Sequence, residues 1–196
     1  MHNRTWWLIT LVGCTGPGPL DELDDAALAA AFETLHAQVY DVYALPLDAD
    51  AVHDTLARSF TGEALTRQYV EHWTTRVRMA DDGTAVDVRR ISHDTTLVLA
   101  RDGSAAEIDA RWSVGGIVRH RSHSHARINR YEAVYGLTWT DAGARIAWTR
   151  MRRAERVGAV LDDGGSGWIL DDLPSSDGGF LDAVDLLEGG LLDGVE

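Results

Sequence analysis

The hydrophobic period of the chain changes once, at Asp81-Asp82-Gly83, and this change limits the possible folds more than any other feature of the sequence. On its N-terminal side, apolar residues recur every three or four positions, which is the spacing of one helix face. The pattern predicts a long helix that starts near Asp24-Asp25 and is interrupted by Pro46, a second helix over residues 49–60, and a third that begins after Thr61-Gly62.

On the C-terminal side, apolar and polar residues alternate, which is the period of a half-buried strand. The alternation predicts five strands, over residues 85–91, 96–100, 107–120, 123–139 and 144–152. Consecutive strands joined by short turns form an antiparallel meander, and helices that precede a meander cover one of its faces. We therefore predict an α+β fold, with about three helices packed on a curved antiparallel sheet.

A short apolar run near the N-terminus leads to the sole cysteine. Arg4 precedes the run Trp6 to Val12, and Gly13-Cys14 follows it, which is the layout of a secretory signal. The segment Leu11-Val12-Gly13-Cys14 resembles a bacterial lipobox, in which the cysteine is diacylated and becomes the mature N-terminus. The resemblance implies a signal peptide over residues 1–13, lipidation of Cys14, and a cell-envelope protein anchored in the membrane on its periplasmic or extracytoplasmic face. The other interpretation of the run is a buried strand followed by a Gly-Pro turn.

The charge of the chain is unevenly distributed. The formal net charge is -13, but ten acidic residues and no basic residue follow Arg156. We interpret residues 158–196 as an acidic, Gly-rich, disordered tail, residues 14–23 as a tether, and residues 24–157 as the folded domain. The acidity argues against a nucleic-acid partner. The single cysteine excludes an intrachain disulfide and a cysteine-based zinc cluster.

Two long strands carry the most distinctive side chains. The residues that share one face of each strand are Ile108, Ala110, Trp112, Val114, Val118 and His120 on the first, and His123, His125, Arg127, Asn129, Tyr131, Ala133, Tyr135 and Leu137 on the second. A two-residue loop, Arg121-Ser122, pairs His120 with His123 and joins the two apolar faces. In this register Gly116 lies opposite Arg127 and is predicted to leave room for its guanidinium.

The shared face is apolar at one end and polar at the other, which is the usual form of a small-molecule site. The candidate ligand-binding residues on this face are Trp112, His125, Arg127, Asn129 and Tyr131.

The histidines at the polar end have three interpretations. His120, His123 and His125 offer three imidazoles to a zinc or copper ion, as catalytic zinc sites do. The arginines and histidines of residues 119–130 alternatively favour a carboxylate, a phosphate or an anionic lipid headgroup. In the third interpretation, the polar side chains of residues 127–131 bond to helix ends in a structural network, and the histidines are solvated.

Helices followed by a meander, together with the run from Trp112-Ser113-Val114-Gly115-Gly116 through the hairpin histidines to Tyr131, resemble the NTF2-like (SnoaL-like, cystatin-like) superfamily over about residues 24–157. Within it, the run is similar to a group of bacterial membrane-associated proteins. The resemblance implies a cone-shaped domain that binds a small molecule or an envelope protein, and it implies that two copies pair through the sheet as a homodimer.

Catalysis has little support in the sequence. The chain contains no Gly-x-Ser-x-Gly elbow, phosphate loop or dinucleotide fingerprint, so a non-catalytic role is preferred and no cofactor is expected beyond the zinc or copper ion. A SnoaL-like acid–base enzyme is the alternative, and it would use His125 or His72. His72 follows Glu71 on the third helix, where we expect it at a solvent-facing or edge position.

Overall fold

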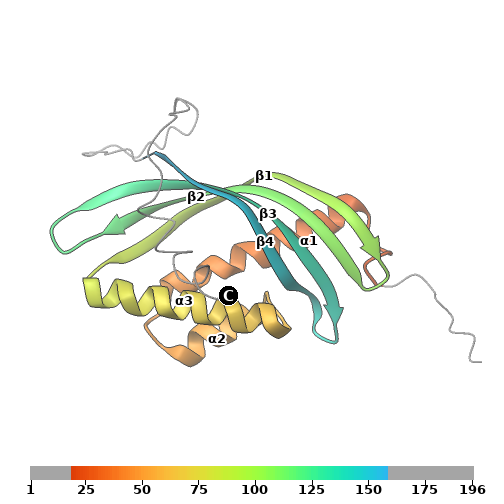
Figure 1. Cartoon of the computed structure of the whole chain (residues 1–196), viewed down its shortest axis with the longest axis horizontal. Coiled ribbons are helices and arrows are strands. Elements are labelled where there is room, and N and C mark those ends of the chain that lie inside the picture. The colour runs from red at the N-terminus through yellow and green to blue at the C-terminus, as the bar shows by residue number, and fades with distance from the viewer. Residues whose placement is uncertain (1–18, 159–196) are drawn as a thin grey trace, which may run out of the picture.

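The computed structural model describes residues 19–158, in which helices cover one face of a four-stranded antiparallel sheet (Figure 1). The predicted signal peptide, the first half of the tether (residues 14–18, with Cys14) and the acidic tail beyond Gly158 lie outside the described residues. Across residues 19–158, no helix combines the length and the apolar character that crossing a bilayer requires.

Short polar caps and a proline set the bounds of the first two helices. Helix α1 (Asp25–Val39) begins where the Asp24 carboxylate accepts the Ala27 N–H at 2.7 Å. It continues as a 3-10 turn, η1 (Tyr40–Ala44), instead of the predicted long helix, and Leu45 is extended, as the proline at position 46 requires of the residue before it. Helix α2 (Ala49–Ala57) is capped in the same way by Asp48.

Helix α3 (Gly62–Asp82) ends as predicted at Gly83, whose φ of 67° lies in the left-handed region. Four strands follow in the order in which they occur in the chain: β1 (Ala85–Asp102), β2 (Ala105–Arg119), β3 (Ser124–Thr140) and β4 (Gly143–Gly158). The prediction of an α+β fold with helices on one face of an antiparallel sheet is confirmed.

The predicted number of five strands is wrong, because residues 85–91 and 96–100 are the two halves of β1. The polar stretch between them, Ser92-His93-Asp94, contains a register shift between His93 and Thr95. Such a β-bulge adds one residue to one strand and leaves the pairing on either side intact. The strand therefore bends without ending, and the bend contributes to the curvature of the sheet.

The predicted register of the β2–β3 hairpin is confirmed. Trp112 pairs with Tyr131, Gly116 pairs with Arg127, and the His120 N–H donates to the His123 carbonyl at 2.8 Å. The explanation offered for Gly116 is wrong. A Cβ atom there would lie 2.7 Å from the Asp87 carbonyl oxygen of β1, so the glycine accommodates the neighbouring backbone and not the guanidinium.

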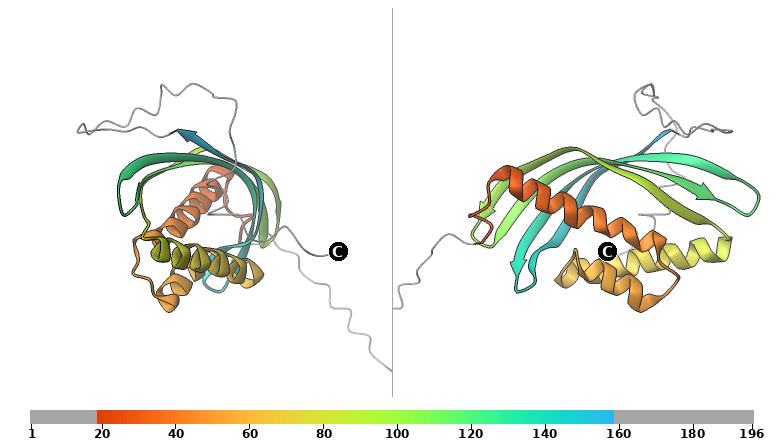
Figure 2. Two further views of the ribbon diagram at one scale, coloured as in Figure 1. Left: turned by 60° about the vertical axis from the view of Figure 1, so that its left-hand side comes forward. Right: turned by 180° about the vertical axis from the view of Figure 1, so that it is seen from behind.

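The main core lies between the helices and the concave face of the sheet, and Figure 2 shows the sheet curving over α1. Phe32 and Leu56 from the helices and Ile108 and Leu137 from the strands are fully buried there. Leu20 is also fully buried, and its N–H donates to the Gly103 carbonyl at 3.3 Å. Packing therefore begins at Leu20, before the predicted domain boundary at residue 24.

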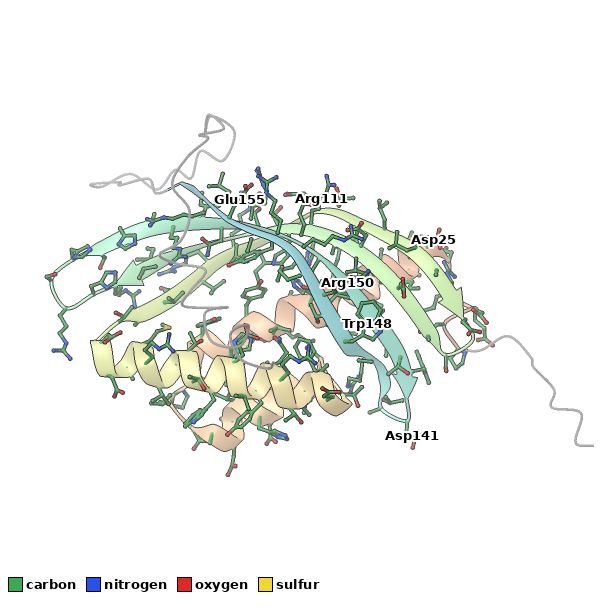
Figure 3. The ribbon with its side chains drawn as sticks, viewed as in Figure 1. Asp25, Arg111, Asp141, Trp148, Arg150 and Glu155 are labelled. Atoms are coloured by element: carbon green, nitrogen blue, oxygen red, sulfur yellow. The ribbon has the colours of Figure 1, made fainter. Side chains whose placement is uncertain are left out.

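The convex face of the sheet carries several ion pairs. Arg111 and Glu155 project from it in Figure 3. The ion pairs on this face join Arg119 and Arg89 to Asp87, Arg152 to Asp109, Arg111 to Glu132, and Arg153 to Glu155. Exposed pairs of this kind contribute little stability individually but keep the face solvated.

Candidate functional site

The tip of the β2–β3 hairpin is attached to the C-terminal end of α3, and both lie at the same end of the molecule (Figure 1). Arg121 donates from Nη2 to the Asp81 carbonyl at 3.1 Å, and Thr84 Oγ1 lies 3.2 Å from His120 Nδ1. A Cβ atom at Gly83 would lie 2.3 Å from Arg121 Nε, so glycine is needed there for space as well as for its left-handed backbone. These contacts fix the position of the tip.

The structure brings the three predicted metal-ligating histidines together at this tip. The ring centroids of His120, His123 and His125 are 4.7, 5.3 and 5.7 Å apart. Their candidate ligand atoms all lie within 4.8 Å of one another. His123 is exposed and the other two are half-buried. Partial burial lowers the pKa of His125, and the neighbouring His120 and Arg156 lower it further, which favours the neutral ring.

The predicted ligand-binding residues further along β3 form a hydrogen-bonded ladder. Arg127 Nε donates to Asn129 Oδ1 at 3.0 Å, and Asn129 Nδ2 donates to the Tyr131 hydroxyl at 2.9 Å. The Tyr131 ring stacks on Trp112, with centroids 5.2 Å apart, and Trp112 Nε1 donates to the Tyr40 hydroxyl at 2.7 Å. Four of the five predicted ligand-binding residues are therefore connected, and the fifth, His125, belongs to the hairpin tip.

A buried chain of polar side chains that the sequence analysis missed crosses the core. His36 Nδ1 lies 2.9 Å from His93 Nε2, and His36 Nε2 lies 3.0 Å from the Tyr135 hydroxyl. Burial, followed by the nearby His93, lowers the pKa of His36 to about 3, so its ring is neutral. The sequence did indicate that His36 is buried, because position 36 belongs to the same helix face as the buried Leu28 and Phe32. The sequence around His36 does not predict its contact with His93, which lies 57 residues further along the chain.

His72 is buried, with 8% of its surface exposed, so the expectation of a solvent-facing or edge position is wrong. The face of α3 that packs on the rest of the molecule runs through Ala64, His72 and Thr75. Within the described residues, His72 Nδ1 and Arg76 Nη1 are buried without a hydrogen-bond partner. Arg76 Nη2 donates to the Leu45 carbonyl at 2.5 Å. Burial, followed by the charge of Arg76, lowers the pKa of His72 to about 4.

Tyr43 of η1 connects these α3 side chains to β3. Its ring lies edge-on to His72 with centroids 5.8 Å apart. Burial raises the pKa of Tyr43, as do Tyr131 and Glu71, whereas Arg76 and Arg127 lower it. We call this group between the helices and the sheet the interlayer site, and its members are Tyr43, Glu71, His72, Arg76, Arg127, Asn129 and Tyr131. The guanidinium groups of Arg76 and Arg127 favour a negative charge near the Tyr43 hydroxyl, whereas burial and the Glu71 carboxylate oppose it.

Neither a protein-family model nor a curated protein matches the chain. Among solved structures, the chain is similar to the intermembrane space region of the chloroplast protein ARC6, with 17% sequence identity and a TM-score of 0.45. The match covers 63% of this chain and 95% of that chain. These comparisons assign no ligand, partner or reaction to the chain.

Proposed function

We propose that the chain is a non-catalytic binding protein of the cell envelope. In this proposal Cys14 carries a lipid anchor, the domain is NTF2-like, and the interlayer site binds a small anionic ligand. The observation that carries the ligand site is the pair of buried polar atoms, His72 Nδ1 and Arg76 Nη1, that have no hydrogen-bond partner among residues 19–158.

A buried polar atom without a partner costs about 1–3 kcal/mol of stability. His72 and Arg76 are four residues apart on α3, so their side chains lie next to each other on one helix face. A ligand that offers oxygen acceptors to this face would remove both costs at once when the neutral His72 ring carries its proton on Nδ1. A carboxylate or a phosphate fits best, because a guanidinium binds either one with two parallel hydrogen bonds.

The Arg76 guanidinium supports an anion over a neutral ligand beside it. Burial lowers the pKa of Arg76, which means that its positive charge is poorly solvated. Burial also lowers the pKa of Arg127, and Arg156 lowers it further, while Tyr131 opposes the shift. A bound anion beside Arg76 would compensate the charge of this guanidinium group.

Binding of an anion should raise the stability of the folded chain. The probes are inorganic phosphate, acetate and benzoate, added to the purified full chain in a thermal-shift assay. An anion at a hundred times its dissociation constant stabilises the folded state by about 2.7 kcal/mol. The proposal predicts that at least one probe raises the melting temperature of the wild type and that Arg76→Gln loses most of the rise.

Arg67→Gln is the matched control, because Arg67 lies on the same helix, is exposed, and pairs only with Glu63 four residues earlier in the described structure. This variant should respond to the probes as the wild type does. Equal shifts in the wild type and in Arg76→Gln, or no shift with any of the three anions, would refute the ligand site.

The envelope location depends on the N-terminal sequence. The segment Leu11-Val12-Gly13-Cys14 supports it by its resemblance to a lipobox. Mass spectrometry of the mature protein is the test: a diacylated Cys14 at the N-terminus is the expected result, and an intact Met1 would refute the anchor while leaving the ligand site open to its own test.

A further inference from the structure

We infer that the tip of the β2–β3 hairpin is a transition-metal site, in which His120, His123 and His125 together bind one Zn²⁺ or Cu²⁺ ion, each through a ring nitrogen. The site is separate from the interlayer site and does not depend on the proposed anion. Four features of the hairpin support a metal site there: the ligand set, the spacing of the rings, the fixed position of the hairpin, and the hydroxyl groups that bond to two of the rings.

The ligand set selects the class of metal. The group of three residues that can hold an ion consists of histidines alone. Imidazole nitrogen suits Zn²⁺ and Cu²⁺, whereas Mg²⁺ and Ca²⁺ require oxygen ligands and iron–sulfur clusters require thiolates. Three histidines with a fourth position open to water are the ligand set of a catalytic type of zinc site.

The three ligand nitrogens have to move only a short distance to bind one ion. Zn–N bonds of about 2.0–2.1 Å in a tetrahedral site place the nitrogens roughly 3.4 Å apart, so ligand atoms now within 4.8 Å have to approach by roughly 1.4 Å at most. The three rings lie within 28° of parallel, and they would turn about their side-chain bonds to point at one ion. His123 is exposed and has the most room to turn, whereas His120 and His125 are half-buried.

The backbone that carries the ligands does not have to move. His120 and His123 are joined by a backbone hydrogen bond across the loop, and His125 is held by the pairing of Val118 with it. Arg121 ties the loop to the Asp81 carbonyl at the end of α3. The hairpin therefore presents the three side chains from a fixed frame, which lowers the conformational entropy lost on binding.

Two hydroxyl groups select the nitrogen that faces the metal. Thr84 Oγ1 lies 3.2 Å from His120 Nδ1, and Ser122 Oγ lies 3.1 Å from His123 Nδ1. A metal-binding histidine donates its other ring N–H to an oxygen atom, which fixes the tautomer and the ring orientation. With Nδ1 engaged in both residues, Nε2 remains for the ion.

The test is a calorimetric titration of the untagged full chain with ZnCl₂. The inference predicts one ion per chain, loss of this binding in His123→Ala, and an affinity about 10-fold lower in Ser122→Ala, where the second hydrogen bond is removed. His53→Ala is the matched control, because His53 is an exposed histidine outside the cluster and pairs with Asp54. This variant should bind zinc as the wild type does.

A spectroscopic measurement identifies the ligands directly. With one equivalent of Cu²⁺, electron paramagnetic resonance should show three coupled nitrogens in the wild type and fewer in His123→Ala. Arg76→Gln should bind both metals normally, so failure of the anion proposal and failure of the metal site are distinguishable. Zinc binding of equal strength in the wild type and in a variant with all three hairpin histidines replaced by alanine would overturn the inference.

Discussion

Acid should destabilise this protein strongly, through two buried histidines. The pKa of His36 is lowered to about 3 and that of His72 to about 4, both mainly by burial. In the unfolded chain a histidine has a pKa of about 6.5. Below that pH the unfolded state takes up protons that the folded state does not, so the stability that each group contributes is present above pH 6.5 and is lost as the pH falls.

The magnitude follows from the two pKa values. Between pH 7 and pH 5 the unfolded form of each histidine becomes mostly protonated, whereas both folded forms stay neutral. The difference lowers the free energy of unfolding by about 2 kcal/mol for each group and roughly 4 kcal/mol for both. A loss of this size is a large part of the 5–15 kcal/mol that typically stabilises a domain.

The assay is urea denaturation of the full chain at pH 7 and pH 5, at constant ionic strength. Other groups also titrate in this range, so the informative quantity is the difference between the wild type and variants. Between pH 7 and pH 5, the free energy of unfolding of His72→Phe should fall by about 2 kcal/mol less than that of the wild type. His53→Gln, at an exposed position, should keep the full loss. A wild type that loses less than about 1 kcal/mol, or a His72→Phe variant with an unchanged loss, would refute the reasoning.

Three further substitutions test the packing around the sites, each by urea denaturation. Trp112→Phe removes the donor to the part-buried Tyr40 hydroxyl and should cost about 1–3 kcal/mol. Gly83→Ala places a methyl group at a φ of 67° and against Arg121, so it should cost about 1 kcal/mol or more. Asp24→Ala removes the cap of α1 and should cost about 1 kcal/mol. Wild-type stability in any one of these variants would contradict the contact assigned to that residue.

Much of the hairpin could be predicted from the sequence. Alternation along β2 and β3 assigns each side chain to a face, because successive residues of a strand point in opposite directions. A shift of one residue between the strands would place the apolar side chains on opposite faces, so only every second register joins the apolar faces. The two-residue loop selects one of these registers. The predicted approach of His120, His123 and His125 followed from these two facts.

The helix–sheet contacts could not be predicted in the same way. The face of α3 that turns inward depends on how the helix packs, and this orientation buries His72 against Tyr43. The contact of His36 with His93 joins residues 57 positions apart across a bulged strand. The periodic spacing of apolar residues along the chain predicts neither contact.

The sequence by itself therefore determined the order of helices and strands, the register of the hairpin and the histidines at its tip. These features depend on neighbours along the chain and on strands joined by a short loop. Only the tertiary structure decided that β1 runs unbroken through its polar stretch, that two histidines are buried, and that α3 and β3 form the interlayer site. These depend on the rotation of each helix and the curvature of the sheet, which many distant contacts set together.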